Sequence, residues 1–160
     1  MAWCVFSSLS FITNSIAAYL YGEYIYSGLW GTLCASSVFL HWLRWFTNVH
    51  VIQPDELYNN TNITHRLLYW AFIIDKIVLH LVVFSGGYLV YKKMEHIKQT
   101  VNDLICCAFI LSTFLLTIVL YYYGYAHSIF SFDTNPDVAD KWHCLLHWVS
   151  SFGNHCILLL

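Results

Sequence analysis

Five long apolar runs, separated by short polar segments, dominate the hydrophobic pattern of this chain. Each run is about the 20 residues that a helix needs to cross a bilayer. Backbone groups in lipid must bond within their own segment, so such runs are expected to be helices. The pattern predicts one all-α domain over residues 1–160, an integral membrane bundle of about five transmembrane helices at about 3–21, 27–46, 67–91, 103–123 and 141–160.

Composition supports this fold class. Hydrophobic residues make up 59% of the 160 residues and charged residues only 10%, whereas soluble domains carry roughly 25% charged residues. The net charge of −2 gives no indication of a nucleic-acid partner. The six cysteines all lie in apolar runs, which predicts small buried packing residues rather than a disulfide framework.

The first polar loop contains two Asn-x-Ser/Thr sequons, at Asn59 and Asn62. Such sequons are used only in a secretory context, so they weakly favour the secretory pathway or the plasma membrane. Which membrane holds the protein stays open at this point.

Histidines stand out inside the apolar runs, where ionisable groups are costly and typically functional. His143 and His147 lie four residues apart in the last run and would share one face of a helix. His41 lies near the end of the second run, and Asp75 lies in the first half of the third. If the helices alternate in direction, these groups meet in one leaflet, each roughly 5–13 Å below the same membrane face. Three histidines and a water molecule are the ligands of a catalytic zinc site.

Two further side chains fit this arrangement. Asp75 could orient the zinc-bound water or take its proton, and Ser37 lies one turn from His41 on the same helix face. His80 and His155 are expected to bond a backbone carbonyl or a hydroxyl instead. His155 would lie about 12 Å deeper than His147, too far to be a ligand of the same ion.

Three stretches resemble the CREST superfamily, which contains alkaline ceramidases, progestin and adipoQ receptors and hemolysin III proteins. They are SVFLH at 37–41, similar to the S-x-x-x-H motif; DKIVLHLVVFSGGY from Asp75, similar to the third-helix pattern; and WHCLLHWVSSFGNH from Trp142, similar to the last-helix H-x-x-x-H. The resemblance implies that His41, His143 and His147 bind zinc and that Asp75 and Ser37 position the reacting water. It further implies hydrolysis of lipid amides, with ceramide as the type substrate.

The chain also departs from that superfamily. Its members have seven spans, and two helices between Asp75 and the last histidine pair are missing here. Cys144 follows His143, where the receptor and hemolysin branches often have glutamate. The expectation is therefore a shortened, divergent member: either an active hydrolase or a degenerate one that binds zinc without turnover.

The leading functional hypothesis is a membrane-embedded, zinc-dependent hydrolase acting on a lipid amide or ester taken from the bilayer. One alternative is a non-catalytic multi-span protein, either a homo-oligomer or a small subunit of a membrane assembly, in which the polar groups are interhelical hydrogen bonds. A less favoured alternative is a haem b protein, with His80 and His155, or His41 and His147, as axial ligands.

Overall fold

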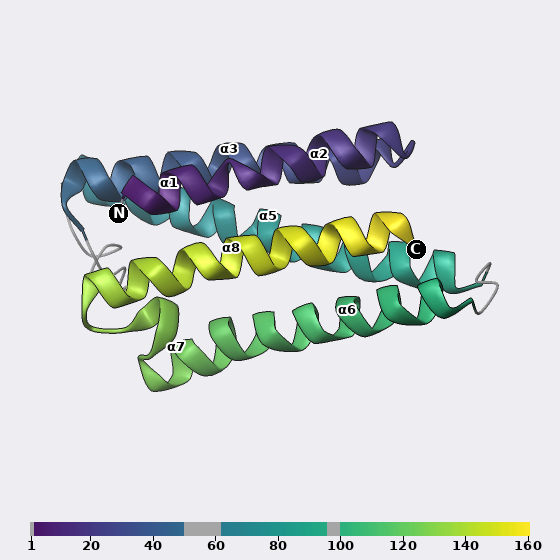
Figure 1. The fold of residues 1–160 in the computed structure, drawn as a ribbon. Coiled ribbons are helices and arrows are strands. Elements are labelled where there is room, and N and C mark those ends of the chain that lie inside the picture. Colours follow the sequence, from purple (N-terminus) through teal and green to yellow (C-terminus); the bar gives the residue numbers. More distant parts are fainter. Residues whose placement is uncertain (1, 50–61, 96–99) are drawn as a thin grey trace.

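The computed structural model describes residues 2–49, 62–95 and 100–160. This part of the chain is almost entirely helical (Figure 1). The elements are α1 (Ala2–Ser8), α2 (Ser10–Leu20), α3 (Tyr24–Thr47), α5 (Ile63–Met94), α6 (Val101–Ile118), the π-helical turn η1 (Val119–Tyr123), α7 (Gly124–His127), the 3-10 turn η2 (Phe130–Phe132) and α8 (Pro136–Leu159).

Each predicted apolar run contains a long helical segment, and the helices begin earlier than the apolar pattern alone suggests. α8 begins at Pro136 rather than near 141 because the Asn135 side chain accepts a hydrogen bond from the backbone N–H of Asp137. Proline is favoured at the first helical position, where its missing N–H would have no partner. α5 likewise begins at Ile63, capped by Asn62 through the backbone N–H of Thr64.

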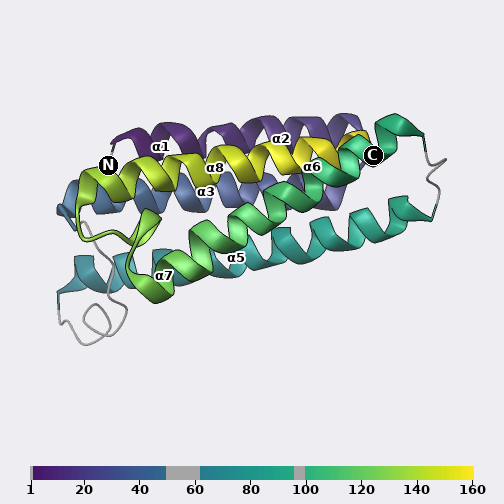
Figure 2. The same ribbon diagram turned by 60° about the horizontal axis from the view of Figure 1, so that its bottom comes forward.

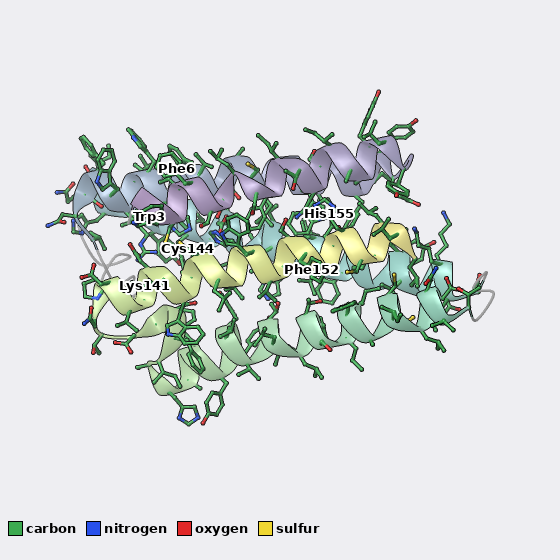
Figure 3. The ribbon with its side chains drawn as sticks, viewed as in Figure 1. Trp3, Phe6, Lys141, Cys144, Phe152 and His155 are labelled. Atoms are coloured by element: carbon green, nitrogen blue, oxygen red, sulfur yellow. The ribbon has the colours of Figure 1, made fainter. Side chains whose placement is uncertain are left out.

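α8 runs through the middle of the bundle. It packs against α1 and α2 on one side and against α6 on the other, while α3 packs against α1, α2 and α5 (Figures 1 and 2). The two sides of α8 can be followed in Figure 3, where His155 lies toward α2 and Phe152 toward α6. α8 therefore contacts most of the long helices of the described chain.

The apolar core lies mainly among α2, α3 and α5. Its buried members are Phe11, Ala18, Tyr26, Trp30, Leu33, Cys34, Val78, Val82, Leu89 and Leu158. α6, in contrast, buries none of its residues in the described structure. Cys4, Cys34 and Cys156 are buried as predicted, whereas Cys106, Cys107 and Cys144 are only half-buried.

Three helical segments of the described chain are long and apolar enough to cross a membrane: Trp3–Leu20, Ile63–Met94 and Val101–Phe132. These three segments are consistent with a membrane protein, whereas the sequence predicts five spans. α3 and α8 have 24 residues each, about 36 Å at 1.5 Å per residue, so they are long enough to span. They also bury polar side chains, which lower their hydropathy; these include His41 on α3 and His147 on α8.

Candidate metal centre

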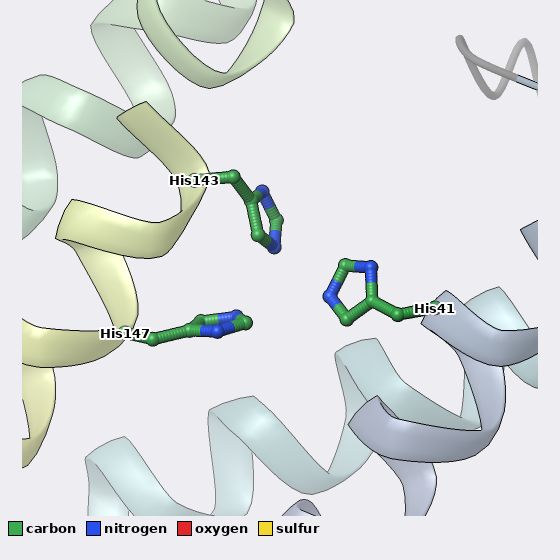
Figure 4. A group of neighbouring side chains, drawn as sticks. All are labelled: His41, His143 and His147. Carbon is green, nitrogen blue, oxygen red and sulfur yellow. The ribbon is translucent and has the colours of Figure 1, made fainter. Parts of the chain in front are cut away.

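Three imidazoles from two helices converge at one point of the bundle (Figure 4). His41 projects from α3, and His143 and His147 project from successive turns of α8. One ring nitrogen from each histidine can be chosen so that all three lie within 4.8 Å of one another. The ring centroids are 4.8 Å apart for His41 and His143, 4.7 Å for His143 and His147, and 5.5 Å for His41 and His147. The predicted meeting of these histidines is confirmed.

Two of the three imidazoles are buried, and His143 is half-buried. His41 is 3% exposed and His147 is 6% exposed, and the ring of Phe11 packs edge-on against His147 at 4.9 Å between centroids. His41 Nε2 is buried and has no hydrogen-bond partner within the described structure. Leaving a buried polar atom unpaired costs about 1–3 kcal/mol. A metal ion bound by this nitrogen would remove that cost.

Ser7 forms a hydrogen bond with the Nδ1 atom of His147 and so fixes the orientation of its ring. Its Oγ lies 2.8 Å from His147 Nδ1 and also 3.1 Å from the backbone carbonyl of Cys4, to which it donates. With its single hydrogen on that carbonyl, the hydroxyl accepts from Nδ1–H, and the lone pair of His147 is then on Nε2. Metal-binding histidines characteristically donate their other ring N–H in this way, which orients the ring and sets its tautomer.

The geometry fits a single ion with modest adjustment. Zinc binds imidazole nitrogen at about 2.0–2.1 Å, so in a tetrahedral site two such nitrogens lie about 3.4 Å apart. The largest separation among the three nitrogens, within 4.8 Å, would have to shorten by about 1.4 Å. Three histidines would leave a fourth position open, as in catalytic zinc sites. The histidines could thus hold a metal ion, although imidazole also suits copper, iron and nickel.

Ser37 and Asp75 lie outside the three-histidine group. Ser37 is buried and its hydroxyl is hydrogen-bonded to that of Ser8, 3.2 Å away. The carboxylate of Asp75 accepts a hydrogen bond of 2.8 Å from Ser36, the residue before Ser37. Asp75 is therefore tied to the helix that carries His41, at a residue five positions before that histidine. Their predicted roles at the reacting water stay predictions.

The other two histidines considered have the partners expected of structural residues. His80 lies 2.7 Å through Nδ1 from the carbonyl of Lys76 and 3.2 Å through Nε2 from the hydroxyl of Tyr122. His155 Nε2 lies 3.2 Å from the hydroxyl of Thr13. Of the two sequons, Asn62 caps α5, and Asn59 lies outside the described residues.

Three serines near the site were missed by the sequence reasoning. Ser7 and Ser8 lie in the first apolar run, and Ser36 directly precedes Ser37, the serine predicted to belong to the site. The available signal was a polar stripe at helical spacing, in which Cys4, Ser7, Ser8 and Asn14 are all buried. Comparison with known proteins adds nothing to these observations, because no family model, curated protein or solved structure matches the chain.

Proposed function

We propose that this protein is a membrane-embedded, zinc-dependent hydrolase that acts on a lipid amide or ester. The observation that carries the proposal is the convergence of three imidazole nitrogens within 4.8 Å, in a bundle whose apolar helices suit a bilayer. Bound there, zinc would supply a Lewis acid that polarises a carbonyl and acidifies a water molecule.

Serines around the cluster orient the side chains that would take part in the reaction. Ser7 holds the ring of His147, and Ser36 holds the carboxylate of Asp75. We assign to Asp75 the handling of the water proton, and to Ser37 a hydrogen bond that positions the reacting group. The bond from Ser8 keeps the Ser37 hydroxyl on the inner face of α3.

In this proposal all five long helical segments cross the membrane, with α3 and α8 joining the three more apolar ones. α8 supports this placement because it turns polar residues inward while Trp148 and Phe152 remain 62% and 50% exposed. Such a helix can face lipid on one side and enclose a site on the other. The substrate would enter from the bilayer, and a second copy of the chain could complete the wall of its cavity.

The proposed relation to the CREST superfamily rests on the same three stretches as before. They fall on α3, α5 and α8, and the fold brings the histidines of two of them together. A shortened member that has kept the metal ligands is consistent with this arrangement. A zinc-binding member without turnover remains the alternative within that family.

The haem alternative has less support. His80 has partners on both ring nitrogens, so it is poorly placed to pair with His155 across an iron atom. The rings of His41 and His147 both lie within 4.8 Å of His143, centroid to centroid, and a porphyrin would need that space. A non-catalytic assembly protein is the remaining competitor, and it predicts no metal.

Metal analysis of the purified full-length chain tests the proposal. We expect about one zinc per chain in the wild type and strong loss in His143→Ala and in His147→Ala. His155→Ala is the matched control on the same helix and should retain zinc, because its ring bonds Thr13. Stoichiometric zinc in both site variants, or a metal-free wild type, would refute the metal centre.

Turnover is then measured as fatty-acid release from a long-chain lipid amide and from the matching ester in mixed micelles. Asp75→Asn should abolish release while zinc remains bound. Zinc-loaded protein that releases no fatty acid from either substrate would favour the degenerate member.

A further inference from the structure

Two cysteines from opposite ends of the chain meet where α1 packs against α8. Figure 3 shows Cys144 on the side of α8 that faces α1. Its sulfur lies 3.8 Å from the sulfur of Cys4, which is 140 positions earlier in the sequence. Both are free thiols, and their contact joins the first helix of the described chain to the last.

The thiol of Cys4 is held in place by two successive turns of α8. Its sulfur lies 3.5 Å from the carboxylate oxygen Oδ1 of Asp140 and 3.7 Å from the backbone carbonyl oxygen of the same residue. Asp140 and Cys144 are four residues apart and therefore lie on one face of the helix. The contact between the two sulfurs is thus part of a fixed arrangement between α1 and α8.

The two thiols differ in exposure, which gives them different chemical roles. Cys144 is half-buried, whereas Cys4 is 1% exposed. A partly exposed thiol can meet a small oxidant, and a second thiol beside it can then complete a disulfide. A disulfide has an S–S distance of about 2.05 Å, so the two sulfurs would have to approach by about 1.8 Å. A change of side-chain rotamer is enough for a movement of this size.

We propose that Cys4 and Cys144 form a reversible disulfide in the presence of a peroxide, and that this bond locks α1 onto α8. The sulfur of Cys144 attacks one peroxide oxygen, the O–O bond breaks, and the thiol proton leaves with the other oxygen as water, giving a sulfenic acid. The sulfur of Cys4 then attacks the sulfur of the sulfenic acid. The S–S bond forms, the S–O bond breaks, and the Cys4 proton leaves with the hydroxide as a second water. Two thiols are oxidised and one hydrogen peroxide is reduced; an added dithiol reverses the change.

The disulfide would act on the metal centre through the neighbours of both cysteines. The backbone carbonyl of Cys4 accepts the hydrogen bond of Ser7, whose hydroxyl lies 2.8 Å from Nδ1 of His147. Cys144 directly follows His143 in α8. A covalent link between these two turns would keep Ser7 against His147 and hinder the separation of α1 from α8. We therefore expect slower release of zinc; this effect rests on the proposed function, whereas the disulfide itself needs no metal.

Treatment of the full-length protein in nanodiscs with hydrogen peroxide tests the pair. Mass spectrometry of the digested, unreduced protein should find the peptide of Cys4 linked to that of Cys144, and dithiothreitol should separate them. Cys107→Ser is the matched control, because it removes another half-buried thiol, on α6, and should leave the link intact. A disulfide between two copies of the chain, or oxidation of Cys144 to a sulfinic acid without a link, would overturn the proposal.

Single variants separate the roles of the two thiols. In Cys4→Ser, oxidation should stop at the sulfenic acid of Cys144, which dimedone captures. In Cys144→Ser, the enclosed thiol of Cys4 should stay reduced. Oxidation of Cys4 in that variant at the wild-type rate would overturn the assigned order of attack.

Release of zinc to a chelator, compared between the oxidised and the reduced wild type, tests the lock. We expect release to be at least fivefold slower from the oxidised protein, and equal rates would overturn the effect on the metal centre. The two proposals fail separately. A wild type that binds no zinc would refute the hydrolase, while a peroxide-dependent link between the peptides of Cys4 and Cys144 in that same protein would still support the disulfide.

Discussion

The two sides of α8 make different kinds of contact: one side buries polar side chains, and the other packs apolar ones. Toward α1, α2 and α3 the helix presents a polar stripe that includes His147, Ser151 and Asn154, all buried. Toward α6 its contact is apolar and close: Phe152 packs edge-on against Phe109 at 5.6 Å, and Gly153 lies against Thr113. We call the side of α8 with His147, Ser151 and Asn154 its chemical face, and the side with Phe152 and Gly153 its packing face.

The difference shows where polar residues can be kept in a bundle of this composition. Buried hydroxyls and imidazoles find partners only where several helices surround them, as Ser7 and His147 do. α6 has α8 as its main neighbour and leaves large apolar side chains exposed along its length. Because nothing covers that surface in the described chain, polar groups there would have no protein partner, and in a bilayer they would face lipid. The comparison predicts that substitutions on the chemical face of α8 change metal binding. Substitutions on its packing face should change only the stability of the fold.

Removing the metal should give the largest effect. A ligand present at 1,000 times its Kd stabilises the folded state by about 4 kcal/mol, so a chelator should lower the thermal midpoint of the zinc-loaded protein. In His41→Ala this shift should largely disappear, because the isolated imidazole of α3 completes the group. Differential scanning fluorimetry with and without chelator measures it. An equal shift in the variant would place the metal elsewhere.

Crowding the packing face should destabilise the fold without affecting zinc. A Cβ at Gly153 would lie 2.5 Å from Thr113 Oγ1 and 3.1 Å from its Cβ. Gly153→Ala must therefore push α6 away from α8, at a cost of about 1–3 kcal/mol typical of overpacking. Denaturant titration measures the loss, and metal analysis should show unchanged zinc.

Gly87→Ala is the matched control for this substitution. A Cβ at Gly87 meets nothing within 4 Å, and the residue is exposed inside α5, two turns before the end of the helix. The change should raise stability by about 0.5–1 kcal/mol through helix propensity. If both glycine variants behaved alike, the close approach of α6 to α8 would be disproved.

Removing the hydroxyl of Ser7 should weaken the metal centre without abolishing it. Loss of a hydrogen-bond partner behind a ligating histidine typically costs 10–100-fold in metal affinity. Competition with a zinc-binding dye would measure this for Ser7→Ala. Ser150→Ala is the control, because within the described residues Ser150 donates to the backbone carbonyl of Leu146 in its own helix. Equal affinities in the two variants would show that Ser7 does not hold the ring of His147.

The histidine group was predictable because few assumptions were needed. Helical geometry places His143 and His147 on one face, and an alternating chain direction brings His41 to the same depth. The serines were not predictable in this way. Which face of the first apolar run points inward depends on how its helix rotates against its neighbours, and the run divides at Leu9 between α1 and α2. Rotation also decides that Asp75 meets Ser36 rather than Ser37.

The five long helical segments were likewise predictable from the apolar runs, although the first is divided between α1 and α2. The residues at which the helices begin were not predictable. Hydrophobicity marks the apolar core of a helix, but capping residues decide where the helix begins. Asn135 extends α8 by a turn into a segment that reads as a polar loop. The same applies to Thr100, whose side chain forms a reciprocal capping box with Asp103 at the start of α6.

The smallest expected effect concerns the far end of the chemical face. Ser151 donates a hydrogen bond of 3.0 Å to Asn14, but both side-chain polar atoms of Asn154 are buried without a partner in the described chain. A satisfied buried group contributes about 1 kcal/mol, and replacing an unsatisfied one by an apolar group of similar shape can be neutral or stabilising. Ser151→Ala should therefore lose about 1 kcal/mol, while Asn154→Leu should keep or gain stability in the same denaturant titration. A lower stability in both variants would mean that the buried polar residues of α8 beyond the histidines stabilise the fold together. The contrast between the chemical and packing faces would then extend along the whole helix.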